Sequence, residues 1–277
     1  MAYRIGVIGT GAGHLGTATP PAPISELAGP DFKPELIETR LRTFPITPYD
    51  RGLTVLAYVD CAIEAEKAGF DAVFINTVGD YGIDEMRSAT SMVVVGAGEA
   101  TMAMSCNIGR RFSIVTIWPP KMNFIYHERL RSTGMEHRCA SIRNVLTNGD
   151  VEGLAGAGQA VTSLKDHNAT VIESALKEID RAVSEDGADT IMLGCTCMAP
   201  IGPELAARSS VPVLESMRTG YKTVEAMSSL GIRHSYEAYP KADPANLGAV
   251  GALVAGQGDL DLGGECEVCV VAQEAAE

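Results

Sequence analysis

Cys195 is the residue whose type and position best suit proton transfer near neutral pH. It lies in the run LGCTCM at residues 193–198, directly after an apolar segment and before Pro200. A thiol at the end of a strand, facing a helix N-terminus, can have its pKa lowered toward neutrality. It can then take up or release a proton at physiological pH. We therefore expect Cys195 to be an acid/base residue, and Cys197 to be either a packing residue or a residue that supports Cys195 without touching the substrate.

A repeat places Thr77 in the position that corresponds to Cys195. The segment GFDAVFINT at 69–77 matches GADTIMLGC at 187–195, because each reads Gly-x-Asp, an apolar run and then a small polar residue. The same offset of 118 residues also relates the apolar segments at 93–95 and 211–213. Chance similarity between two βαβ units is the alternative. The repeat predicts two similar lobes that face each other, with Thr77 and Cys195 across a shared cleft.

Apolar runs bounded by Gly or Asp alternate with stretches of helical spacing, which indicates an α/β fold with mainly parallel sheets. The predicted strands are 4–9, 35–39, 72–76, 92–95, 112–117, 190–194 and 211–214. The predicted helices include 53–68, 99–109, 170–185 and 216–230. We predict a first lobe at 1–97 plus 218–255, a second lobe at 98–217, and a C-terminal extension at 256–277.

Composition and charge narrow the possible partners. The chain has 277 residues, 46% of them hydrophobic, and a net charge of −13. An acidic protein cannot neutralise nucleic acid or an anionic membrane, so neither is expected as a partner. The seven cysteines show no framework spacing, and we find neither a secretory signal nor a bilayer-spanning run. We expect a cytoplasmic protein with reduced thiols, acting on a small molecule and forming a homo-oligomer.

Several of these segments together resemble one enzyme family. The run around Cys195 resembles the second catalytic-cysteine segment of aspartate/glutamate/hydantoin racemases. VVVGAGEA at 93–100, GRRFSIVT at 109–116 and GDYG at 79–82 are similar to hydantoin racemases in particular. The resemblance covers roughly residues 50–220. It implies a two-lobed pseudosymmetric fold and proton transfer at a carbon beside a carbonyl or carboxylate, without metal or coenzyme.

The sequence departs from this family at Thr77, where such racemases have a second thiol. A threonine hydroxyl is a poor base at neutral pH, although it can donate a hydrogen bond to a developing enolate or carboxylate oxygen. Three alternatives remain for the reaction. In the first, another group near the first lobe, such as Asp80, supplies the second base. In the second, a single thiol protonates a carbanion, as in the related arylmalonate decarboxylases. In the third, Cys195 is the nucleophile or acid of a lyase or isomerase reaction. A non-catalytic ligand-binding protein on the same scaffold is the alternative from another class.

Further residues are expected to bind the substrate, a small carboxylate or cyclic amide such as a hydantoin or amino-acid derivative. In the resemblance to the decarboxylases, Tyr126 is placed as a donor to the substrate. Glu215 follows the strand at 211–214 and faces the predicted cleft, where a buried carboxylate would need a partner. The remaining candidates follow the strand ends: Thr10, Asn76, Val78 and Thr196.

Two other patterns are weak indications. GTGAGHLG at 9–16 matches a dinucleotide-binding fingerprint, but the prolines at 20, 21 and 23 exclude the helix that a pyrophosphate needs. A loop whose amides hold a substrate carboxylate, with His14 nearby, is the better interpretation. Cys266 and Cys269 have metal-like spacing without a second ligand pair, so no metal is expected.

Overall fold

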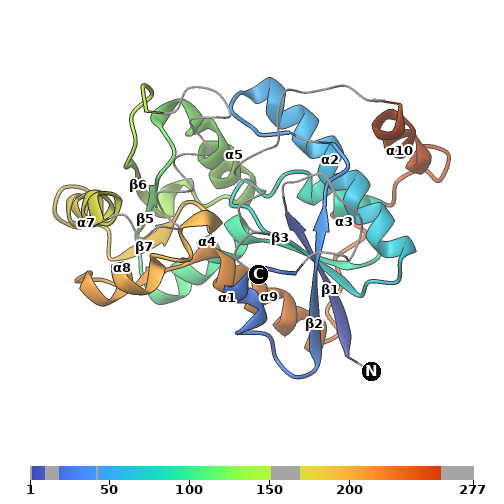
Figure 1. Ribbon diagram of the computed structural model, residues 1–277, viewed down its shortest axis with the longest axis horizontal. Helices are drawn as coiled ribbons and strands as arrows, with labels where there is room; N and C mark the ends of the chain where they lie inside the picture. Colours follow the sequence, from blue (N-terminus) through green and yellow to red (C-terminus); the bar gives the residue numbers. More distant parts are fainter. Residues whose placement is uncertain (1, 10–18, 42, 151–168, 257–277) are drawn as a thin grey trace. The chain divides into compact units, whose positions relative to one another are not determined.

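A computed structural model describes residues 2–9, 19–41, 43–150 and 169–256. The predicted α/β class is confirmed, because the protein has two four-stranded parallel sheets flanked by helices (Figure 1). The chain forms two compact units. Of the described residues, unit 1 contains 2–9, 19–41, 43–76, 81–96 and 221–256, and unit 2 contains 77–80, 97–150 and 169–220. These limits differ from the predicted lobes chiefly at residues 77–80, which pack with the second unit.

The strands and helices have the following bounds. The strands are β1 (Tyr3–Gly9), β2 (Phe32–Glu38), β3 (Ala72–Ile75), β4 (Val93–Gly96), β5 (Phe112–Thr116), β6 (Cys139–Asn144), β7 (Thr190–Leu193) and β8 (Val213–Leu214). The α-helices are α1 (Ala22–Ser25), α2 (Pro48–Lys67), α3 (Ile83–Ala89), α4 (Ala97–Ile108), α5 (Phe124–Thr133), α7 (Ala169–Ser184), α8 (Gly202–Arg208), α9 (Ser216–Ser229) and α10 (Leu247–Ala255). Short 3-10 helices are η1 (Pro120–Met122), η2 (Glu136–Arg138) and η3 (Thr196–Met198). Within the described residues, no helix is both long and apolar enough to cross a membrane.

The two units share one sheet topology, which supports the sequence repeat. Unit 1 has the strand order β2-β1-β3-β4, and unit 2 has the order β6-β5-β7-β8. All neighbouring strands are parallel. Strands β3 and β7 have the same length and coincide at the repeat offset. Each unit is therefore built on the same βαβ arrangement, with β3 and β7 in equivalent central positions.

The repeated Gly-x-Asp pattern has one structural role in both units. Gly69 and Gly187 have φ values of 77° and 70°, a left-handed conformation that glycine adopts without steric cost. In unit 1, Asp71 accepts the backbone N–H of Arg4 at 2.7 Å. In unit 2, Asp189 accepts the N–H of Arg111 at 3.0 Å. The aspartates thus fix the start of each central strand against its neighbour.

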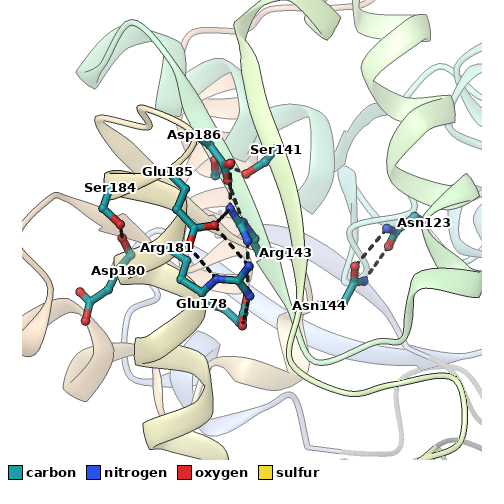
Figure 2. Close-up of polar contacts among 11 residues, drawn as sticks. Asn123, Ser141, Arg143, Asn144, Glu178, Asp180, Arg181, Ser184, Glu185 and Asp186 are labelled. Carbon is teal, nitrogen blue, oxygen red and sulfur yellow. Dashed lines mark hydrogen bonds and ion pairs between the residues drawn. The ribbon is translucent and has the colours of Figure 1, made fainter.

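Strand β6 was not predicted, because none of its residues is fully buried and its sequence CASIRN carries no apolar run. It is the edge strand of its sheet, and side chains attach it to α7 and the following turn (Figure 2). The Arg143 guanidinium pairs with Asp186 at 2.7 Å and with Glu185 at 2.8 Å. These ion pairs raise the pKa of Arg143 above its ordinary range. Ion pairs therefore help to hold β6 in place, and its sequence lacks the apolar run from which a strand is predicted.

The edge of unit 1 at β4 is also covered by polar side chains. The Val94 N–H donates to His234 Nε2 at 2.8 Å, and the Val94 carbonyl accepts from Arg87 Nη2 at 3.0 Å. His234 is in edge contact with Tyr239, and Arg87 donates to the Tyr239 hydroxyl at 3.1 Å. Burial, together with the charges of Arg87 and Lys241, lowers the pKa of His234 to about 4. The segment after α9 therefore closes this edge with a neutral histidine.

This arrangement predicts a pH-dependent contribution to stability. Folded His234 stays neutral where the unfolded chain, with an ordinary pKa of 6.5, binds a proton. The contribution is therefore full above pH 6.5 and is lost as the pH falls toward about 4. Urea unfolding of wild type and His234→Gln from neutral to acidic pH should show the wild-type advantage shrinking on acidification. A difference that stays constant with pH would contradict this assignment.

Candidate functional site

Cys195 begins the turn that follows β7, and its sulfur has two partners there. The N–H of Cys197 donates to Cys195 Sγ at 3.1 Å. The two cysteines are also joined by a disulfide bond, with Cα atoms 5.1 Å apart. The expectation that the thiols are reduced is therefore wrong for this pair, and Cys197 is more than a packing residue. Among the described cysteines, Cys61, Cys106 and Cys139 are free.

Thr77 occupies the equivalent turn after β3. The N–H of Gly79 donates to Thr77 Oγ1 at 3.0 Å, just as the N–H of Cys197 donates to Cys195 Sγ. In each turn the second residue after the strand accepts the amide hydrogen two residues further along. Thr77 and Cys195 thus have matching local geometry and both belong to unit 2. That they line one cleft stays a prediction.

Asp80 closes the Thr77 turn and holds the start of α4. Its carboxylate accepts the N–H groups of Gly98 at 2.8 Å and Glu99 at 2.7 Å, an N-terminal capping interaction. Asp80 is buried and has a φ of 43°, a conformation that the short aspartate side chain tolerates. Burial and the Glu99 carboxylate raise the pKa of Asp80 to about 7. Because both carboxylate oxygens bind backbone amides, Asp80 serves the helix and gives no support to a role as second base.

Val78 fixes the same turn from its other side. Its side chain is buried in the core of unit 2, together with Ile114 of β5 and Met192 of β7. Tyr126 and Met102 belong to the same cluster. Val78 was predicted to bind substrate, and its side chain instead anchors the Thr77 turn to the sheet that carries Cys195. Any contact of Val78 with substrate has to come through its backbone.

Tyr126 holds the residue that precedes Cys195. Its hydroxyl donates to the Gly194 carbonyl at 2.8 Å and lies 2.6 Å from Thr116 Oγ1, which accepts the N–H of Trp118 at 3.2 Å. Tyr126 is buried, and burial raises the pKa of its hydroxyl. Its single hydrogen is given to Gly194, so Tyr126 positions the Cys195 turn, and its role as a substrate donor stays a prediction.

Glu215 is partly buried between β8 and α9, and it has the partners that a carboxylate there requires. Its oxygens accept the N–H groups of Met217 at 2.6 Å and Arg218 at 3.0 Å. The Arg218 guanidinium lies 3.4 Å from Glu215 Oε2 and donates to the Ala199 carbonyl at 3.4 Å. Burial raises the pKa of Glu215. Glu215 thus caps α9, and Arg218 joins it to the end of η3, which follows Cys195.

The remaining candidates differ in how far the structure describes them. Thr196 is buried at the start of η3. Asn76 is partly buried and donates its N–H to the Ile8 carbonyl at 3.1 Å. Thr10, the glycine-rich loop with His14, and Cys266 and Cys269 lie outside the described residues. Within the described part of the chain, no three His, Cys, Asp or Glu side chains converge as metal ligands would.

Three residues that shape the site were not singled out from the sequence. Thr116 ends a strand and carries the hydroxyl that meets Tyr126, so its place at a strand end was a usable signal. Arg218 lies in the first turn of α9, where a basic residue is ordinarily expected to face the solvent. Gly98 allows α4 to pack closely against the Thr77 turn, a tertiary contact that no sequence pattern indicates.

The contact at Gly98 gives a testable prediction. A Cβ atom at position 98 would lie 2.2 Å from the Val78 carbonyl oxygen and 2.7 Å from Asp80 Oδ2. Gly98→Ala should therefore cost about 1–3 kcal/mol of unfolding free energy, as overpacking does. The control is Gly52→Ala in α2, where the described structure places no atom within 4 Å and a gain of about 0.5–1 kcal/mol is expected. Equal effects of the two substitutions in urea unfolding would refute the close contact.

Comparison with known proteins agrees with these features. The Asp/Glu/Hydantoin racemase family profile matches residues 5–224. A hydantoin racemase from Paenarthrobacter aurescens is 30% identical over 188 residues, which are 68% of this chain and 74% of the relative. The structure of an allantoin racemase from Klebsiella pneumoniae superposes with a TM-score of 0.71 at 25% identity, covering 87% of this chain and 95% of the other.

Arylmalonate decarboxylase shares the fold, with a TM-score of 0.55 at 21% identity over 83% of this chain and 95% of the other. The resemblance stated from the sequence is thus confirmed, and the non-catalytic alternative loses its support. This chain belongs to the Asp/Glu/hydantoin racemase family, and it is an enzyme of that family.

Proposed function

We propose that this enzyme moves a proton at a carbon beside a carbonyl group, with the reduced Cys195 thiol as the proton carrier. The observation that carries the proposal is the pair of equivalent turns after β3 and β7. They present one sulfur and one hydroxyl in matching local geometry. The reaction requires the Cys195–Cys197 disulfide to be reduced, since a disulfide sulfur has no proton to give.

The Cys197 amide supports the acid/base role of Cys195. An N–H that donates to a thiolate stabilises the charged form and lowers the pKa of the thiol. The 3.1 Å contact between this N–H and Cys195 Sγ supplies such a donor. The Gly194 carbonyl, bound by Tyr126, and the Gly194 N–H, which donates to Val115 at 2.8 Å, keep the turn in place. A thiol tuned toward neutral pH exchanges protons most effectively under physiological conditions.

Thr77 is proposed to stabilise negative charge on the substrate. The Gly79 N–H occupies a lone pair of its hydroxyl oxygen, which leaves the hydroxyl hydrogen available for donation. A donor aimed at a developing enolate oxygen is worth about 3–4 kcal/mol in the transition state. The Thr77 hydroxyl therefore has a useful role even though it is a poor base.

A cyclic amide is the proposed substrate class. The relatives at 25–30% identity are a hydantoin racemase and an allantoin racemase. A proton on a carbon next to a carbonyl can leave because the resulting charge spreads onto the carbonyl oxygen. The hydroxyl of Thr77 and the amides of the two turns are suitable donors for that oxygen.

A second candidate is a reaction that needs only one proton transfer, such as decarboxylation followed by protonation. The observation that favours it is the hydroxyl at position 77, together with the engagement of Asp80 in capping α4. A single thiol that removes and returns a proton on one face restores the original configuration. Racemisation therefore needs a second proton donor, whereas protonation of a carbanion does not.

Isotope exchange in heavy water tests the function and separates the two candidates. Candidate cyclic amides and malonate-type acids are incubated with reduced enzyme in heavy water. Deuterium in recovered starting material of both configurations indicates racemisation, and deuterium only in a product shortened by carbon dioxide indicates decarboxylation.

Cys195→Ala should reduce turnover about 10²–10⁴-fold, the usual contribution of a general acid or base. Cys106→Ser is the matched control, because Cys106 is a free cysteine near the C-terminal end of α4, whereas the N-terminal end of this helix contacts the Thr77 turn. Undiminished turnover by Cys195→Ala would overturn the proposed function.

The hydroxyl at position 77 yields a separate prediction. Thr77→Cys places a thiol in the turn equivalent to that of Cys195, so racemisation should become faster by about 10²-fold or more. Thr77→Ser, which keeps the hydroxyl, should behave like wild type. The rate of change in optical rotation of a single enantiomer provides the measurement. If Thr77→Cys and Thr77→Ser racemise equally fast, the proposed correspondence of the two turns fails.

A further inference from the structure

The disulfide between Cys195 and Cys197 is partly exposed in a turn whose neighbouring residues are buried. Both cysteines are partly exposed, whereas their neighbours Gly194, Thr196 and Met198 are buried. Their Cα atoms are 5.1 Å apart, within the range of about 4.4–6.8 Å that disulfides require. The backbone at this turn therefore has the spacing that a disulfide between the two cysteines needs.

We infer that Cys195 and Cys197 form a reversible oxidation site, in which Cys197 captures the oxidised sulfur of Cys195. The inference rests on the proposed function for one point only, that Cys195 is the working thiol. Oxidation then switches the enzyme off, because a disulfide sulfur neither holds nor accepts the transferred proton. Reduction restores the thiol. The oxidant belongs to the class of peroxides, and the reductant to the class of small dithiols.

The chemistry balances in two steps. The Cys195 thiolate attacks an oxygen of hydrogen peroxide, the O–O bond breaks, and with one added proton the products are a sulfenic acid and water. The Cys197 sulfur then attacks the sulfenic sulfur, the S–O bond breaks, and a second water leaves as the S–S bond forms. The two thiols lose two electrons in total, and the peroxide gains them. A dithiol reverses the change by thiol–disulfide exchange and becomes a disulfide itself.

The other described cysteines are less suited to this chemistry. The thiolate is the reactive form, and burial raises the pKa of Cys61 and Cys106 and raises that of Cys139 to about 11. None of these three is in a disulfide. Cys195, in contrast, has a backbone N–H directed at its sulfur and a second cysteine within bonding distance. Geometry therefore directs oxidation to this pair.

Peptide mapping provides a test that is independent of activity. Trypsin releases residues 182–208 as one peptide, which contains Cys195 and Cys197 and no other cysteine. After stoichiometric hydrogen peroxide and alkylation, this peptide from the full-length protein should be two hydrogen atoms lighter than the dithiol and carry no alkyl group. After dithiothreitol it should carry two alkyl groups. The peptide that contains Cys139 should be alkylated in both samples.

Activity is measured on the same samples, each relative to its own fully reduced form. Wild type should lose turnover with peroxide and regain it with dithiothreitol. Cys197→Ser cannot form the bond, so with a second equivalent of hydrogen peroxide its Cys195 should be oxidised from the sulfenic acid to the sulfinic acid, and its lost activity should not return.

Two results would overturn the inference: full alkylation of both cysteines in peroxide-treated wild type, or full recovery of oxidised Cys197→Ser with dithiothreitol. Failure of the proposed function would look different. Cys195→Ala would then keep its turnover, whereas the wild-type 182–208 peptide would still show the masses expected for a reversible disulfide.

Discussion

The site depends on one short-range interaction, the donation of a backbone N–H to the side chain two residues earlier. It occurs after β3, from Gly79 to Thr77, and after β7, from Cys197 to Cys195. Residues after the carboxyl ends of parallel strands are common functional positions, and here the turn also gives the side-chain atom a fixed partner. For a thiol the same N–H favours the charged form, so the proposed reactivity of Cys195 has the same origin as the geometry of its turn.

The surroundings of the two turns explain why they are so firmly held. Gly194 has both backbone groups bound, by Val115 and Tyr126, and Arg218 joins the following η3 to Glu215. The Thr77 turn is fixed by Val78 in the core and by the Asp80 carboxylate on α4. Several polar residues near the two turns therefore bind the backbone and hold it in place. In the functions proposed above, the single sulfur of Cys195 serves both proton transfer and redox control.

Much of this organisation could be predicted from the sequence. The repeat identified β3 and β7 as equivalent strands, because each is an apolar run that directly follows a Gly-x-Asp sequence. The repeat offset then identified Thr77 as the counterpart of Cys195. Strand β6 was missed because ion pairs of Arg143, rather than buried apolar residues, hold it in place. Asp80 was considered as a second base and Tyr126 as a substrate donor. Their observed partners, the amides of α4 and the Gly194 carbonyl, depend on tertiary contacts that no local sequence pattern indicates.

The pKa of the Cys195 thiol in the reduced protein tests the central claim most directly. It is obtained from the pH dependence of iodoacetamide alkylation, followed on the 182–208 peptide by fragmentation that distinguishes Cys195 from Cys197. Cys139 in the same protein serves as the internal reference, since burial raises its pKa to about 11. We predict that the alkylation of Cys195 has its midpoint at a pH clearly below about 8.5, the pKa of an ordinary thiol. A midpoint at or above that value would contradict it.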